Sequence, residues 1–347
     1  MSRPVVRTLL AAAVTTAALV AVPQAAFANM PATDPGTGGV HIGVLVGPPT
    51  TVDTTAPRVA PRKPSAPRTP TTTTTTTTGS DISYPQCSVT PPANQLFGVI
   101  GVNGGTAKDF NPCLGTQFDW AAKTTGTVPQ GTASLYVNTA NPGSRSSWWP
   151  KSDMDRPTVD AAVAGPRNPL PDTPITYPGG GTPGCSSEVD PFGPACSYVY
   201  GYVRAEQAVA YAQEQLGEAY SAKVRWWLDV ETTNTWAGPT TSNAASLAGA
   251  ATSLLRVGQA ADGVGRVGVY SSTAQYSAIT GGTGSAVPNL PDGGRSPLIG
   301  LPEWGAGASD LEGAKSNCGV TAFTGGAITL TQFVSGTLDY DVSCGGY

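Results

Sequence analysis

Two acidic residues end a hydrophobic run near the middle of the chain, in the segment Trp226-Trp227-Leu228-Asp229-Val230-Glu231. On a β-strand, residues i and i+2 point to the same side, with Cα atoms about 6.5 to 7 Å apart. Two carboxyl groups so placed at the end of a buried strand repel each other and lose hydration, so one of them keeps its proton near neutral pH. A proton donor beside an anion is what glycosidic bond cleavage requires. In the alternative, structural interpretation, Asp229 caps the next helix and Glu231 faces water.

Further acids lie at the two ends of the same region. Asp81 belongs to a short apolar stretch, and Asp339 and Asp341 lie close to the C-terminus. Taken alone, each is typical of a turn or a helix cap. In a closed barrel the first and last strands are neighbours, so Asp81 and Asp341 would approach the strand that bears Asp229. Asp339 would replace Asp341 if the register shifted by two residues.

Short β-type runs alternate with helical patterns over residues 81–347. The predicted strands are Phe97–Val102, Ala133–Asn138, Val224–Val230, Arg266–Tyr270 and Ile328–Phe333. Between them, apolar residues recur at helical spacing over Arg204–Leu216 and over Leu247–Leu255. This alternation predicts an α/β fold with a mainly parallel sheet. Periodicity alone leaves open whether the sheet closes as a barrel or stays open with helices on both faces.

The segment from Thr139 to about Tyr200 is rich in Pro, Gly and Asp and has no clear period. It is too long for an ordinary connection. Because it follows a strand, we expect it at the C-terminal face of the sheet, where α/β enzymes build their sites. Its aromatic residues, Trp148, Trp149, Tyr198 and Tyr200, would then form a substrate rim. The alternative is a disulfide-pinned decoration with no part in binding.

The N-terminal 80 residues contain no candidate core. Residues 1–28 carry Arg3 and Arg7, an apolar run and the ending Ala26-Phe27-Ala28, which predicts a signal peptide; a membrane anchor is the alternative. Residues 29–80 are rich in Pro and Thr, with unbroken threonine from Thr71 to Thr78, and are predicted to be a disordered linker. The sequence thus predicts a secreted protein with one folded domain, residues 81–347, and no integral membrane segment in the mature chain.

Charge and cysteine content narrow the possible partners of this domain. Residues 81–347 carry 13 lysines and arginines against 21 acids, which makes nucleic acid an improbable partner. All six cysteines lie there, and an even number in an exported protein indicates disulfides. Proximity along the chain suggests Cys87–Cys113, Cys185–Cys196 and Cys318–Cys344. Zinc is the competing interpretation, but the chain has no CxxC pair and its one histidine, His41, lies in the linker. We therefore expect no metal and no cofactor.

Other catalytic schemes find little support. Residues 81–347 contain no histidine, which excludes Ser-His-Asp and Cys-His nucleophilic catalysis. A GxGxxG string occurs at Gly263, Gly265 and Gly268. Dinucleotide binding needs such a string directly after a strand, whereas this one leads into a predicted strand.

Several short motifs, in this order, resemble the family 25 glycoside hydrolases. They are Asp81-Ile82-Ser83, Leu228-Asp229-Val230-Glu231, Val267-Gly268-Val269-Tyr270-Ser271 and Leu330-Thr331-Gln332-Phe333 before a final Asp. The family comprises the Chalaropsis-type lysozymes, muramidases that cleave the peptidoglycan glycan on a β/α barrel. The resemblance spans essentially all of residues 81–347 and implies a single-domain (β/α) barrel, similar to a TIM barrel and containing disulfides.

The resemblance also implies roles for individual residues. Glu231 would be the general acid and Asp229 an electrostatic or nucleophilic partner, and Asp81 and Asp341 would line the site. The substrate-binding residues would be four side chains near the strand ends, namely Tyr136, Tyr270, Gln332 and Trp227. Aromatic rings stack on sugar faces, and a buried Gln can form hydrogen bonds with hydroxyl groups.

The chain also departs from the family pattern. Its last predicted strand has Leu-Thr-Gln-Phe where Trp-Gln-Tyr is usual, and Asp341 is followed by Val-Ser where Asp-x-Asn is common. We expect an O-glycosyl hydrolase, lysozyme-like and monomeric, that acts on an envelope polysaccharide such as peptidoglycan and is secreted or associated with the cell wall. The alternative is a catalytically silent carbohydrate-binding or structural envelope protein on the same barrel.

Overall fold

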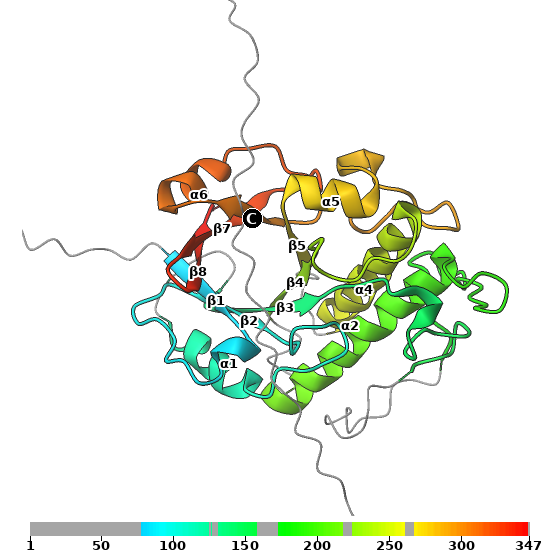
Figure 1. Ribbon diagram of the computed structural model, residues 1–347, viewed down its shortest axis with the longest axis horizontal. Helices are drawn as coiled ribbons and strands as arrows, with labels where there is room; N and C mark the ends of the chain where they lie inside the picture. The colour runs from blue at the N-terminus through cyan, green and yellow to red at the C-terminus, as the bar shows by residue number, and fades with distance from the viewer. Residues whose placement is uncertain are drawn as a thin grey trace, which may run out of the picture. The chain divides into compact units, whose positions relative to one another are not determined.

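A closed barrel of eight strands, in the order β1 to β8, forms the centre of the protein (Figure 1). The computed structural model describes residues 78–124, 126, 131–157, 173–217, 224–260 and 267–345. All of them belong to one compact unit, Thr71–Tyr347. The strands are β1 (Thr78–Ile82), β2 (Gly98–Gly101), β3 (Ala133–Asn138), β4 (Arg225–Asp229), β5 (Val267–Ser271), β6 (Glu303–Ala308), β7 (Ile328–Ser335) and β8 (Leu338–Ser343).

The predicted α/β barrel is confirmed, with one antiparallel strand. Neighbours from β1 to β7 pair in parallel, whereas β8 is antiparallel to both β7 and β1. The first residues of β8 therefore lie at the end of the barrel where β1 and β4 finish. Strand β1 begins at Thr78, so the barrel starts three residues before the predicted boundary at residue 81. The predicted signal peptide and nearly all of the predicted linker lie outside the described residues.

Strand β4 shows why hydrophobic runs form this barrel. All of its residues, Arg225 to Asp229, are buried, as expected for a strand with side chains on both faces covered. Trp226 and Leu228 belong to the cluster that packs against the helices, while Trp227 belongs to a second cluster inside the barrel. Asp229 has the same parity as Trp227, so it continues the inner face.

The inner cluster consists of five buried side chains from the regions of β2, β4, β6 and β7: Phe97, Val99, Trp227, Trp304 and Leu330. Gly268 of β5 pairs with Trp227, and a Cβ atom on it would lie 2.3 Å from the Trp227 ring. Gly268 thus makes room for an indole. This packing role accounts for the last glycine of the GxGxxG string, whose other two glycines lie outside the described residues.

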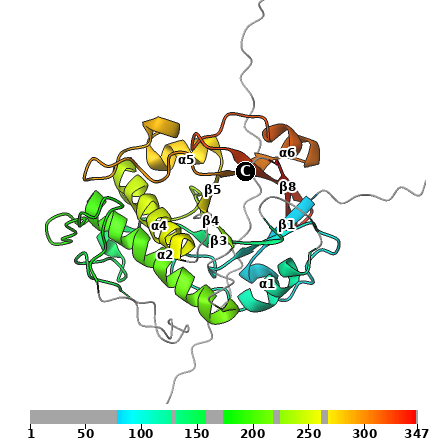
Figure 2. The ribbon, with the colours of Figure 1, turned by 180° about the vertical axis from the view of Figure 1, so that it is seen from behind.

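The α-helices are α1 (Leu114–Ala122), α2 (Pro194–Leu216), α4 (Thr240–Ala260), α5 (Thr273–Thr280) and α6 (Leu311–Asn317), with 3-10 turns at Tyr84–Gln86, Gly143–Arg145 and Gly284–Ala286. Helices α2 and α4 lie side by side along one flank of the barrel in both views (Figures 1 and 2). The start of α2 was predicted ten residues too late, at Arg204. It begins at Pro194, whose fixed φ suits the first helical turn.

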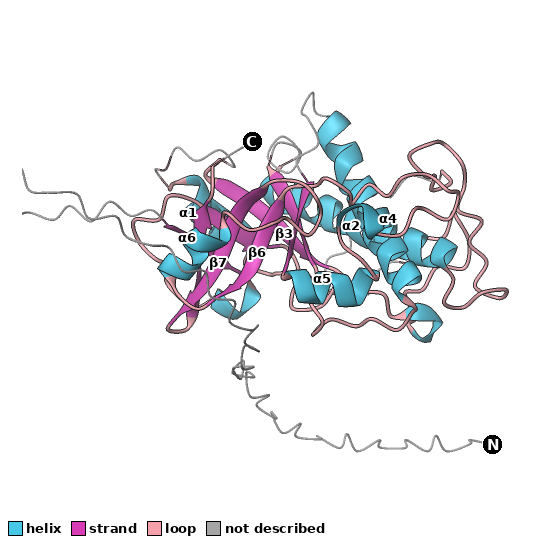
Figure 3. Cartoon of the chain, turned by 90° about the horizontal axis from the view of Figure 1, so that it is seen from above, coloured by secondary structure: helices cyan, strands magenta, loops and turns pink. Residues whose placement is uncertain are grey.

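The irregular segment between β3 and α2 packs against these two helices. Figure 3 shows loops on the side of α2 and α4 away from the strands. There Trp149, Tyr198 and Tyr200 are buried in a separate apolar cluster with Tyr177 and Cys185. These aromatic residues support the segment itself, so the prediction that they form a substrate rim is wrong for Trp149, Tyr198 and Tyr200. Tyr198 and Tyr200 are in fact part of α2.

The three expected disulfides, Cys87–Cys113, Cys185–Cys196 and Cys318–Cys344, are all present. Such bonds form in oxidising compartments, which fits an extracellular protein. Among the described residues, no helix is both long and apolar enough to span a bilayer.

The Cys318–Cys344 disulfide ties the end of α6 to the residue after β8. Removing it by a double alanine substitution is expected to lower the free energy of unfolding by about 3 kcal/mol, since the bond restricts a long loop of the unfolded chain. Urea unfolding at fixed pH measures the change. Equal stability of the variant and the wild type would show that the bond contributes nothing to holding β8 in the barrel.

Candidate active site

Five acidic side chains gather at the end of the barrel where β1 and β4 finish. Asp229 is the last residue of β4, and Glu231 follows it by two positions. Asp81 of β1 pairs in register with Asp339 of β8. Asp341 lies two residues further into the barrel and is fully buried, whereas Glu231 and Asp339 are half-buried.

The electrostatic interactions among these acids show that they form one group. Burial raises the pKa of Asp229 well above its usual range, and the charges of Glu231 and Asp81 raise it further. Burial also raises the pKa of Asp81 to about 8, with a further contribution from Asp339. The pKa of Glu231 is raised by burial and then by Asp339. Carboxyl groups from β1, β4 and β8 therefore interact directly.

Asp229 is held by the end of the neighbouring strand. Asn138, the last residue of β3, pairs with Asp229 in register, and its Nδ2 donates a hydrogen bond of 2.7 Å to Asp229 Oδ2. The Thr139 hydroxyl donates to the Asp229 carbonyl oxygen at 2.5 Å. Asp229 Oδ1 is buried and has no hydrogen-bond partner among the described residues. The Asn138 contact thus fixes one of the two carboxylate oxygens.

Gln332 connects Asp81 to an aromatic residue on another strand. Its Nε2 donates to Asp81 Oδ2 at 2.9 Å, and its Oε1 accepts a hydrogen bond of 2.7 Å from the Tyr270 hydroxyl. Both ends of the Gln332 amide are therefore occupied inside the barrel. The structure brings Gln332 and Tyr270 into the group of acids, as expected, but gives Gln332 a positioning contact with Asp81.

Aromatic rings form the floor beneath the acids. Trp304 of β6 donates from Nε1 to Asp341 Oδ1 at 2.8 Å. The Tyr270 ring centroid lies 4.4 Å and the Tyr136 centroid 6.2 Å from that of Trp304. Burial, and then the surrounding carboxylates, raise the pKa of both tyrosines well above its usual range, so their hydroxyls remain proton donors.

Trp227 was predicted to contact the substrate, but its side chain lies too deep in the barrel to do so. Its side chain is 0% exposed, and its ring packs 5.8 Å from that of Trp304. A side chain without solvent exposure does not reach a sugar at the mouth of the barrel. Trp227 instead supports the layer that carries Trp304.

The backbone around Glu231 is tethered on both sides. Its carbonyl oxygen accepts a hydrogen bond of 2.7 Å from Trp236 Nε1 and another from the Asn234 amide. The next residue, Thr232, donates from its backbone to Gln275 Oε1 at 2.7 Å. These contacts fix the position of Glu231 while its carboxyl group stays half-buried. A carboxyl group that is held in place and partly exposed is suited to proton donation.

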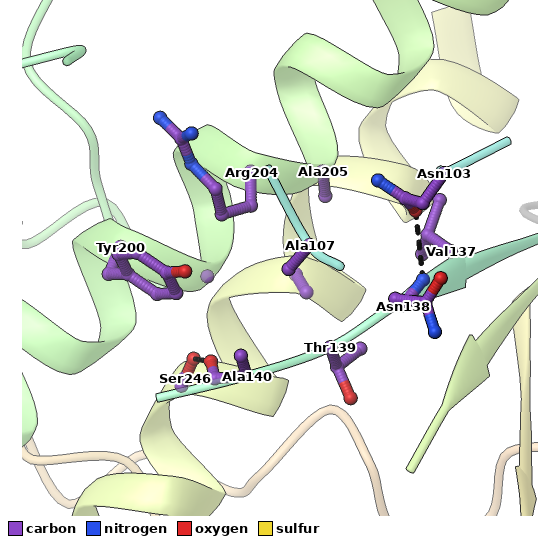
Figure 4. A pocket seen from close by; sticks show the side chains of 12 residues that line it. Asn103, Ala107, Val137, Asn138, Thr139, Ala140, Tyr200, Arg204, Ala205 and Ser246 are labelled. Carbon is purple, nitrogen blue, oxygen red and sulfur yellow. Dashed lines mark hydrogen bonds between the residues drawn. The ribbon is translucent and has the colours of Figure 1, made fainter. Parts of the chain in front are cut away.

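Metal binding finds no support within the described residues, where no cluster of His, Cys, Asp and Glu has the arrangement to hold an ion. A small pocket beside β3 is distinct from the acid site. It lies between β3, α2 and α4 and is lined by Asn103, Asn138, Thr139 and Arg204, among others (Figure 4). It adjoins the acid site at Asn138 and Thr139, which both donate hydrogen bonds to Asp229.

Sequence reasoning missed two polar contacts of this site, from Asn138 and Trp304. Asn138 ends a strand that was predicted correctly, so its position at a C-terminal strand end was an available signal. Trp304 lies in β6, whose sequence Glu-Trp-Gly-Ala-Gly-Ala has no β-type hydrophobic pattern. That strand is therefore detectable only from its pairing with β5 and β7.

Comparison with known proteins does not assign a family. No family model matches the sequence, and no curated protein matches it. Among solved structures, the chain is similar to the spore cortex lytic enzyme SleM of Clostridium perfringens, with 14% sequence identity and a TM-score of 0.39, over 80% of this chain and 69% of that chain. So distant a likeness establishes neither a family nor an activity for this chain.

A sixth buried acid, Glu303, lies at the opposite end of the barrel from this site. It is 1% exposed, and its Oε1 accepts hydrogen bonds from the Thr324 backbone amide and hydroxyl. Burial raises its pKa from 4.5 to about 7. The folded state disfavours the ionised form of Glu303. The contribution of protonated Glu303 to the free energy of unfolding is therefore fully present below pH 4.5 and is lost as the pH rises through 7.

Glu303→Gln is therefore expected to remove part of the pH dependence of stability. Glutamine keeps an oxygen acceptor for Thr324 but carries no charge. Between pH 4 and pH 7.5, the free energy of unfolding of the wild type should fall by on the order of 3 kcal/mol more than that of the variant. Urea unfolding of both proteins across this range measures the difference. If the difference in stability between the two proteins stayed constant across this pH range, Glu303 would not ionise within it.

Proposed function

We propose that this barrel hydrolyses a glycan of the cell envelope, such as peptidoglycan, by carboxylate acid/base catalysis. The supporting observation is the meeting of five mutually interacting carboxyl groups at one end of the barrel. Because each negative charge raises the pKa of its neighbours, the group holds both protons and negative charge near neutral pH. Glycosidic cleavage needs both at once.

In this proposal Glu231 is the general acid. It is the half-buried acid whose pKa is raised by burial and by Asp339, so it can carry a proton to the leaving oxygen. Asp229, the last residue of β4 and two positions before Glu231, is the electrostatic or nucleophilic partner. The hydrogen bond from Asn138 orients its carboxyl group and leaves Oδ1 toward the reacting sugar. Tyr136 and Tyr270 offer ring surfaces for the sugar.

Asp81 and an acid of β8 complete the proposed site. Asp341 was the expected residue, but it is 0% exposed and accepts a hydrogen bond from Trp304. Asp339 lies opposite Asp81 in register and is half-buried. We assign the substrate-facing role on β8 to Asp339, and assign to Asp341 the role of a buried acid that holds Trp304.

The same proposal includes export and action outside the cell. Three disulfides inside the barrel unit support it, as does the alanine-rich N-terminal segment. The partner is then the glycan itself, bound by a monomer without a metal or cofactor.

Release of reducing sugars from purified peptidoglycan sacculi, and from a panel of other envelope polysaccharides, tests this function directly. The purified protein is expected to release reducing ends from at least one of them. If it binds a polysaccharide in a pull-down but cleaves none, the catalytically silent alternative is correct and hydrolysis is rejected.

A further inference from the structure

The acid site has no balancing positive charge in the part of the chain that the structure describes. For Asp81, Asp229, Glu231 and Asp341, each charge that shifts the pKa belongs to another acid of the same group. The described salt bridges, Lys108–Asp109, Arg156–Glu206 and Lys315–Glu312, all lie elsewhere. The site therefore carries an uncompensated negative potential whenever its acids ionise.

The described cations near these strands lie against other groups. Arg225, at the start of β4 and so at the opposite end of that strand from Asp229, lies 5.4 Å from the centre of the Trp227 ring. Lys108, in the loop after β2, contacts Asp109 at 3.4 Å and lies 4.8 Å from the centre of the Trp148 ring. In Figure 4 the Arg204 guanidinium group points away from Asn138, the residue that contacts Asp229. Arg204 donates instead to the Pro157 carbonyl oxygen and lies over the Tyr200 ring.

A buried acceptor in the site also lacks a partner. Asp229 is 6% exposed, and its Oδ1 receives no hydrogen bond from any described residue, while its Oδ2 is bound by Asn138. A buried oxygen of this kind is costly unless a ligand supplies a donor. The charges of Glu231, just after β4, and of Asp81, in β1, both act on Asp229. The unpartnered oxygen therefore lies within the acid group, where a bound donor would also meet negative charge.

We propose that the barrel prefers a glycan whose amino sugars are N-deacetylated, so that a free ammonium group binds among these carboxyls. An ammonium group supplies both the missing positive charge and N–H donors for an oxygen such as Asp229 Oδ1. An acetamido group supplies one N–H and no charge. Anionic substituents near this position would meet repulsion from the acids. This preference rests on the proposed function, because it concerns the same site.

The test compares three forms of one peptidoglycan preparation: as isolated, N-deacetylated, and N-deacetylated then re-acetylated with acetic anhydride. The second form is expected to be cleaved with kcat/KM higher than the third by about tenfold or more at low salt. Added salt should reduce the advantage, since it screens an exposed charge interaction. Equal or faster cleavage of the re-acetylated form would overturn the preference.

A binding experiment separates this preference from the proposed hydrolysis. Calorimetry with the full-length Glu231→Gln variant compares glucosamine and N-acetylglucosamine oligosaccharides of the same length. Tighter binding of the glucosamine oligosaccharide supports the preference even if the wild type cleaves no glycan, in which case only hydrolysis fails. Cleavage by the wild type without a difference in binding or in rate between the two classes leaves hydrolysis standing and rejects the preference.

Discussion

Replacing Glu231 with glutamine is expected to slow glycan hydrolysis by roughly 10²- to 10⁴-fold, the usual contribution of a positioned general acid. Glutamine has nearly the same shape but carries no proton that it can transfer. The backbone contacts of Glu231 with Trp236 and Asn234 do not involve its carboxyl group, so they remain in the variant. Initial rates of reducing-sugar release from the same polysaccharide measure the effect.

Two controls show whether such a loss is chemical. The stability of Glu231→Gln at pH 7 should equal or exceed that of the wild type, because the fold disfavours the ionised form of this acid. Glu312→Gln removes an exposed acid of α6 that pairs with Lys315 outside the site, and it should retain full activity. A folded Glu231→Gln protein with wild-type rates would reject the role assigned to Glu231.

Replacing Trp227 with alanine is expected to lower the free energy of unfolding by about 3 to 5 kcal/mol, the usual cost of removing a large buried aromatic side chain. Trp227 is 0% exposed, and its ring packs against Trp304 inside the barrel. Since Gly268 leaves space that only an indole fills, the neighbouring strand cannot readily close the cavity. Urea unfolding followed by circular dichroism measures the loss.

The same variant also tests where Trp227 acts. Val334→Ala, at a side chain that is 55% exposed, provides the comparison and should change stability by less than about 0.5 kcal/mol. Trp227→Phe should lower the free energy of unfolding by less than Trp227→Ala and by more than Val334→Ala, because phenylalanine keeps a ring in the cluster. If Trp227→Ala were as stable as the wild type but bound glycan weakly, Trp227 would be a substrate contact and not a core residue.

Most of the barrel was predictable because its buried strands are short hydrophobic runs. β2, β3, β4, β5 and β7 were predicted to within a few residues, and proximity of cysteines along the chain identified all three disulfides. β6 was missed because its glycines and alanines give no hydrophobic alternation. The start of α2 was missed because residues 194–203 contain Pro194 and Gly201, which weaken a helical pattern.

For the site, the sequence by itself determined which acids could interact. Asp229 and Glu231 were paired by their spacing, and Asp81 was joined to them by the assumption of a closed barrel. The first expectation rests on local strand geometry, in which i and i+2 share a face, although β4 ends at Asp229 and Glu231 lies just beyond it. The second rests on barrel closure, which makes the first and last strands neighbours.

Only the tertiary structure decided how deeply each acid lies and what contacts it. The antiparallel direction of β8 sets Asp339 opposite Asp81 and places Asp341 further inside, where Trp304 binds it. The direction and register of that strand follow from pairing with both β7 and β1, and no local pattern in its own sequence encodes them. Asn138 and Gln332 lie far along the chain from the acids that they contact. Their hydrogen bonds depend on the closed barrel, so no local sequence pattern predicts them.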